Sequence, residues 1–97
     1  MSAEWQQHGD LYTLDDMTAE RAADDNAFVI TSLGTDPNID QAFSAIESAM
    51  RFGKIRLRVT PQTKATIDKL TKAGRIKCVR TVGTEHEELG IMGIKRG

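Results

Sequence analysis

Apolar and charged residues alternate over residues 54–60, KIRLRVT, more regularly than anywhere else in the chain. Ile55, Leu57 and Val59 take every second position, and a lysine or arginine precedes each of them. This period of two is typical of a strand that turns one face to the core and the other to water. We therefore predict a strand here, and its solvent face carries three positive side chains: Lys54, Arg56 and Arg58.

A helical pattern precedes this strand. Apolar residues recur at steps of three and four over residues 39–50, which places them on one face of a helix. Asp36 followed by Pro37 predicts the start of the helix, because an N-cap side chain and a proline at the first helical position suit such a start. Gly53 predicts its end.

A second helix is predicted behind the strand. Thr60 followed by Pro61 repeats the same starting pattern, and Gly74 predicts the end of this helix. Three further strands are predicted from their β-branched and apolar content, over residues 27–33, 76–82 and 88–95. Residues 83–87, GTEHE, would form the turn between the last two strands.

The predicted order is β-α-β-α-β-β, which gives a single α+β domain over residues 27–97. Two right-handed crossovers place both helices on one face of a four-stranded sheet, so the other face is open to water. Residues 1–26 show no sustained apolar period and are acidic. We predict that they form an N-terminal arm, partly disordered or folded into a short helix from Thr13.

Composition agrees with one ordinary globular domain, since 39% of the 97 residues are hydrophobic and 28% are charged. No apolar run reaches the roughly 20 residues of a membrane helix, and the acidic start does not resemble a signal peptide. The single cysteine, Cys78, has no partner for an internal disulfide, which is typical of a reducing compartment. These features predict a cytoplasmic protein with no membrane partner.

The net charge of −1 conceals a separation between the two halves of the chain. Residues 1–50 hold one basic residue against ten acidic ones, and residues 51–97 hold twelve basic residues against four acidic ones. Such asymmetry favours a surface that binds polyanions, an acidic segment that binds a partner, or both. It is equally explained if the two halves neutralise each other across the fold.

The element order resembles that of the C-terminal domain of bacterial translation initiation factor 3, the archaeal Alba proteins and the CRM-type ribosome-maturation domains. The resemblance lies in the strand FVITSL, the helix IDQAFSAIESAM, the alternating KIRLRV, the helix TKATIDKLTKAG and the closing pair KCVRTVG and GIMGIKR. It covers about residues 27–96 and is one of pattern, so it implies a nucleic-acid-binding fold without assigning a role to any residue.

No pattern of catalytic or metal-binding residues stands out. Cys78 lies in a predicted strand without a neighbouring base, so we interpret it as a buried structural thiol. Acidic residues and one histidine follow one another over residues 85–88, but consecutive residues rarely converge on one metal ion. Paired carboxylates such as Asp15 and Asp16 lie in polar sequence where little desolvation is expected. We predict a protein that is not an enzyme and uses no cofactor or metal.

The first functional hypothesis is a small nucleic-acid-binding module, with RNA or a ribonucleoprotein as the favoured partner. Its basic open sheet face would hold phosphates, and the shortage of aromatic residues predicts contacts to the backbone and shape of the nucleic acid. The residues predicted to bind are Lys54, Arg56, Arg58, Lys77, Arg80, Lys95 and Arg96.

The second hypothesis is a phage-type inhibitor or adaptor, whose acidic half engages a basic surface of another protein. Its predicted contacts are Asp15, Asp16, Glu20, Asp24 and Asp25. A winged-helix arrangement of residues 60–97 ranks third, because three acidic residues in the predicted wing would repel phosphates. The sequence leaves a homodimer open.

Overall fold

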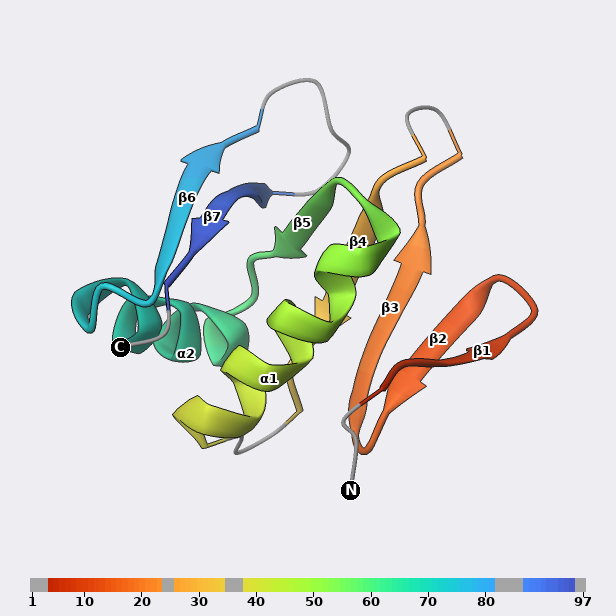
Figure 1. Ribbon diagram of the computed structural model, residues 1–97, viewed down its shortest axis with the longest axis horizontal. Helices are drawn as coiled ribbons and strands as arrows, with labels where there is room; N and C mark the ends of the chain where they lie inside the picture. Colours follow the sequence, from red (N-terminus) through yellow and green to blue (C-terminus); the bar gives the residue numbers. More distant parts are fainter. Residues whose placement is uncertain (1–3, 24–25, 35–37, 82–86, 96–97) are drawn as a thin grey trace.

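A computed structural model describes residues 4–23, 26–34, 38–81 and 87–95 and shows one mixed sheet with two helices against one of its faces (Figure 1). In these ranges the sheet has seven strands, in the order β1-β2-β3-β4-β5-β7-β6. The strands are β1 (Gln6–His8), β2 (Leu11–Leu14), β3 (Met17–Arg21), β4 (Phe28–Ser32), β5 (Ile55–Arg58), β6 (Ile76–Arg80) and β7 (Glu88–Ile94). The helices are α1 (Ile39–Ala49), followed by the short 3-10 turn η1 (Met50–Phe52), and α2 (Pro61–Lys72).

The mixed α+β class and the position of both helices on one face agree with the prediction, but the four-stranded sheet does not. From β4 onward the elements follow in the predicted order, and β4 pairs parallel to β5 across the α1 crossover. The last strand, β7, inserts between β5 and β6 and runs antiparallel to both. β6 is therefore the edge strand on that side of the described sheet.

The prediction of a disordered or helical arm before residue 27 is wrong for the described part of that segment. β1, β2 and β3 form an antiparallel meander that joins the sheet beside β4. Asp15 and Asp16 make the two-residue turn between β2 and β3, and Asp15 has the positive φ of 56° that such turns require. The four-stranded sheet of the prediction thus gains three strands on its β4 side.

The helix starts follow capping rules, with one change of residue. Asn38 caps α1, since its side-chain oxygen accepts a hydrogen bond from the Gln41 amide at 2.7 Å. The predicted starting residues Asp36 and Pro37 lie outside the described residues. Thr60 caps α2 as predicted, with the Thr63 amide 3.1 Å from its hydroxyl, and Pro61 is the first residue of that helix.

The core lies between the helices and the face of the sheet that they cover. Trp5 and Tyr12 come from the N-terminal meander and are 3% and 6% exposed, and both make edge-to-face contacts with the fully buried ring of Phe28. The Trp5 indole N–H donates to the carbonyl of Ala45 in α1 at 2.9 Å. Segments that are 40 positions apart in sequence are therefore joined by aromatic packing and a buried hydrogen bond.

Gly34 is held in a conformation that suits only glycine. Its φ is +86°, and a Cβ added there would lie 2.5 Å from Oδ2 of Asp16, in the β2–β3 turn. We expect Gly34→Ala to lower the free energy of unfolding by about 1–2 kcal/mol, because a Cβ strains the left-handed backbone and the exposed carboxylate of Asp16 must also rotate away. Urea unfolding followed by circular dichroism measures the loss.

Two other glycines separate the two causes of that loss. Gly9 has a φ of +66° but nothing within 4 Å of an added Cβ, so Gly9→Ala should cost about 1 kcal/mol from backbone strain alone. Gly93 has neither feature, and Gly93→Ala should change stability by less than about 0.5 kcal/mol. An equal loss in Gly34→Ala and Gly9→Ala would show that the contact with Asp16 carries no energy.

Candidate nucleic-acid interface

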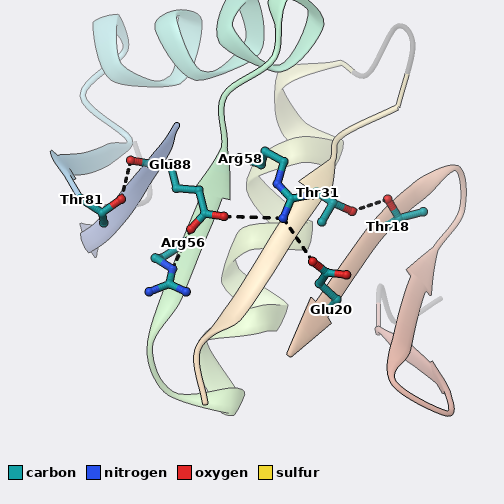
Figure 2. A network of polar contacts seen from close by, with 7 residues as sticks. All are labelled: Thr18, Glu20, Thr31, Arg56, Arg58, Thr81 and Glu88. Carbon is teal, nitrogen blue, oxygen red and sulfur yellow. Dashed lines mark hydrogen bonds and ion pairs between the residues drawn. The ribbon is translucent and has the colours of Figure 1, made fainter. Parts of the chain in front are cut away.

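The arginines of β5 lie on the sheet face away from the helices, as predicted, but acidic side chains neutralise them there (Figure 2). Arg56 is only 9% exposed, and its Nε lies 2.9 Å from Oε1 of Glu88 on the neighbouring strand β7. Glu88 is itself 4% exposed. This is a buried ion pair, and removing either partner would leave the other charge poorly compensated.

Arg58 completes a chain of alternating charges across three strands of the same face. Its Nη2 lies 3.7 Å from Oε2 of Glu88 and 3.1 Å from Oε1 of Glu20 on β3 (Figure 2). Glu20, Arg56, Arg58 and Glu88 are called the ion-pair cluster below. Because two carboxylates offset its two guanidinium groups, this cluster is a poor site for phosphates.

The ion-pair cluster was not expected from the sequence because it depends on strand register. Arg58 and Glu88 are directly opposite each other in the β5–β7 pairing, and Arg56 faces Gly90, which has no side chain. Glu88 opens a predicted strand, so an antiparallel pairing of that strand with β5 would have brought it beside the arginines. Glu20 falls in the segment predicted as an arm or short helix, and its sequence context indicates a strand only weakly.

The remaining predicted phosphate-binding residues are distributed over the molecule. Lys54 is exposed just before β5, and Arg80 is exposed with its Nη2 3.7 Å from Oε1 of Glu87. Lys77 and Lys95 are exposed near each other at one end of the β6–β7 pair. Arg96 lies outside the described residues. The predicted set is therefore not one surface, and Lys77 and Lys95 form a separate group.

Two lysines of α2 extend this group. Lys69 and Lys72 stand in the last turn of α2 on its exposed side, since the buried residues of that helix are Thr63, Thr66, Ile67 and Leu70. The chain then turns at Gly74 and enters β6 (Figure 1), so Lys77 follows Lys72 by five residues. Lys69, Lys72, Lys77 and Lys95 are called the lysine cluster below.

The lysine cluster differs from the arginines of β5 in its charge environment. Within residues 4–23, 26–34, 38–81 and 87–95, none of its four members forms an ion pair. The end of a helix favours positive charge, which accounts for Lys69 and Lys72 as parts of α2. It does not account for Lys77, which lies on β6, or for Lys95, which follows β7. The cluster is thus a source of positive charge that the described part of the fold leaves uncompensated.

The acidic residues of the second hypothesis are also divided. Asp15 and Asp16 are exposed in the β2–β3 turn, whereas Glu20 belongs to the ion-pair cluster. Asp24 and Asp25 lie outside the described residues. The turn bearing Asp15 and Asp16 is at the β1–β3 side of the sheet, and the lysine cluster is at the β6 side (Figure 1). The charge separation seen along the sequence therefore persists in space for these groups.

The described residues offer little support for a metal site, a membrane-spanning helix or a reactive thiol. They contain no group of three or more histidine, cysteine or acidic side chains placed to hold a metal ion, and no helix among them is long and apolar enough to cross a membrane. Cys78 is half-buried, and burial raises the pKa of its thiol, which favours the unreactive protonated form. No protein-family model, no curated protein and no solved structure matches this chain.

Proposed function

We propose that this protein is a small nucleic-acid-binding module that holds the phosphate backbone with the lysine cluster. The observation that carries the proposal is that Lys77 and Lys95 line one pocket, and that α2, which carries Lys69 and Lys72 in its last turn, leads directly into β6 beside it. Four ammonium groups that form no ion pair in the described fold are suited to phosphates, because binding releases the counterions of the nucleic acid.

The nature of the side chains favours backbone contacts. Lysine is a flexible point charge that attracts phosphates without reading a base sequence. The three phenylalanines are committed to the fold, since Phe28 and Phe43 are buried and Phe52 stacks on Phe28 at 4.6 Å between ring centroids. RNA is the first ligand to test, because the element order from β4 onward resembles that of ribonucleoprotein domains.

The test compares charge reversal inside and outside the lysine cluster. A fluorescein-labelled RNA of about 20 nucleotides is titrated with protein, and fluorescence anisotropy gives the Kd at several salt concentrations. With four phosphate contacts, the logarithm of affinity should fall with the logarithm of salt concentration at a slope of about −3. Lys77→Glu with Lys95→Glu should weaken binding at least tenfold and reduce this slope by more than about 1.

Lys64→Glu is the matched control. Lys64 is an exposed lysine of the same helix α2, but it lies in the first turn, at the opposite end of the helix from Lys72. This variant should retain the affinity and the salt slope of the wild-type protein. If the double variant binds the RNA as tightly as Lys64→Glu does, the lysine cluster does not bind nucleic acid and the proposal is wrong.

A further inference from the structure

A pocket of about 500 Å³ lies between the end of α2 and the outer pair of strands, and two residues of the lysine cluster, Lys77 and Lys95, belong to its lining. Its apolar lining includes Ile76, Cys78 and Ile94. This volume lies within the range of small-molecule sites, and the combination of apolar and positively charged lining residues suits a flat apolar group that is attached to an anion.

Arg75 provides a flat, fixed surface in the wall of this pocket. Its guanidinium carbon lies 4.3 Å from the centroid of the Phe43 ring, and its Nη1 lies 2.8 Å from Oδ1 of Asp40. The Phe43 ring packs against the guanidinium, and the Asp40 carboxylate restrains its rotation. The Arg75 side chain remains 21% exposed, and arginine planes that are held in this way stack on nucleic-acid bases.

The strand at the pocket adds polar groups that a base could use. β6 is an edge strand of the described sheet, so its outer side carries backbone N–H and C=O groups that no neighbouring strand takes up. Groups of this kind can form hydrogen bonds with the edge of a base.

We propose that this pocket receives one unstacked base of a single-stranded nucleic acid, stacked on Arg75, while Lys77 and Lys95 hold the adjacent phosphates. The inference rests on the proposed function and names its substrate class. A base inside a duplex is stacked between its neighbours and paired with the opposite strand, so it cannot enter the pocket. The protein should therefore prefer single strands to duplex.

The experiment measures this preference directly. Anisotropy titrations use the same labelled RNA of about 20 nucleotides, once as a single strand and once annealed into a blunt duplex. Stacking of one base is worth about 1–3 kcal/mol, so the wild-type protein should bind the single strand at least fivefold more tightly at equal salt. Arg75→Lys keeps the positive charge but removes the plane, and it should lose this preference while its affinity for the duplex stays unchanged.

Alkylation of Cys78, the only cysteine of the chain, fills the same pocket without a mutation. The adduct with N-ethylmaleimide, formed at mildly alkaline pH, should bind both RNAs with the affinity that the unmodified protein has for the duplex. Cys78→Ala is the control, and treatment with the same reagent should leave its preference for the single strand at the value that it has before treatment. Circular dichroism verifies that each protein is folded.

The outcomes separate this inference from the proposed function. Equal binding of single strand and duplex by the wild-type protein would overturn the pocket proposal, and so would a preference that survives both Arg75→Lys and alkylation. Either result leaves the lysine cluster as the phosphate site if Lys77→Glu with Lys95→Glu still weakens binding. If that double variant binds like the wild-type protein, the proposed function itself fails.

Discussion

Replacing Glu88 by glutamine should lower the free energy of unfolding by about 3–5 kcal/mol, because it takes the charge from a buried ion pair without removing the partner charge. The carboxylate of Glu88 is 5% exposed and contacts Arg56 at 2.9 Å and Arg58 at 3.7 Å. The amide keeps the shape of the side chain but offers only a weak partner to the guanidinium of Arg56. Thermal unfolding should show the change, at roughly 4–8 °C per kcal/mol for a domain of this size.

Glu20→Gln is the matched control for this prediction. Glu20 contacts the same arginine, Arg58, at 3.1 Å, but its side chain is 49% exposed. Water can therefore replace the lost interaction, and we expect a change of less than about 1 kcal/mol. Similar losses in the two variants would show that burial does not set the energy of the ion-pair cluster.

A double replacement tests the energy and the function of the ion-pair cluster together. Arg56→Met with Glu88→Leu removes both buried charges and should recover most of the stability that Glu88→Gln loses, since apolar residues of similar size often replace such a pair without cost. Because this variant leaves the lysine cluster intact, it should bind RNA like the wild-type protein. A strong loss of binding would indicate that the open sheet face, and not the lysine cluster, holds the phosphates.

The elements with a clear period were predictable because local sequence and tertiary packing agree in them. α2 begins at Thr60 and Pro61 as expected, and β5 has its apolar residues Ile55 and Leu57 buried against the helices. The parallel pairing of β4 with β5 follows from the crossover between them. What the sequence did not indicate is that β7 inserts beside β5, since a hairpin strand can lie on either side of its partner.

The N-terminal meander was missed because local preference and tertiary structure conflict there. Ala19, Glu20 and Arg21 favour a helix by intrinsic propensity, but they form β3 between β2 and β4. The strand pattern is present in a weak form, because Tyr12 and Leu14, and then Met17 and Ala19, recur two apart on either side of the Asp15–Asp16 turn. A short strand in which only every second residue is apolar is hard to recognise from the sequence when its partner strands are unknown.

The candidate site was partly predictable for a similar reason. Lys77 and Lys95 were identified from the charge of the second half of the chain, but Lys69 and Lys72 were read only as the solvent face of a helix. The turn at Gly74 connects the end of α2, where Lys69 and Lys72 lie, to β6, where Lys77 lies. The pairing of Arg56 and Arg58 with carboxylates depends on register, and register is set by the whole sheet.

Trp5→Ala should also destabilise the fold by about 3–5 kcal/mol, although Trp5 stands at the edge of the described chain. Its indole is 3% exposed, its ring centroid lies 5.3 Å from that of Phe28, and its N–H donates to Ala45 at 2.9 Å. Alanine would leave a cavity between the meander and α1. Urea unfolding followed by circular dichroism is the appropriate measurement, because the substitution removes the only tryptophan.

One further variant separates the ring packing of Trp5 from its hydrogen bond, and a second serves as a control. Trp5→Phe keeps an aromatic ring beside Phe28 but loses the hydrogen bond to Ala45, and we expect a smaller loss of about 1–2 kcal/mol. Gln6→Ala, at the exposed neighbouring position, should change stability by less than about 0.5 kcal/mol. If Trp5→Ala were as stable as Gln6→Ala, the N-terminal meander would not be part of the core.

The same packing determines what a truncation can show. Removing residues 1–21 would take away β1, β2 and β3 together with Trp5 and Tyr12, and would expose one side of Phe28 and the whole edge of β4. We expect this truncated protein to be largely unfolded under conditions in which Trp5→Phe is folded. Its affinity for RNA or for a basic protein would then report the loss of the fold, so point substitutions such as Asp15→Asn are the sound test of the acidic residues.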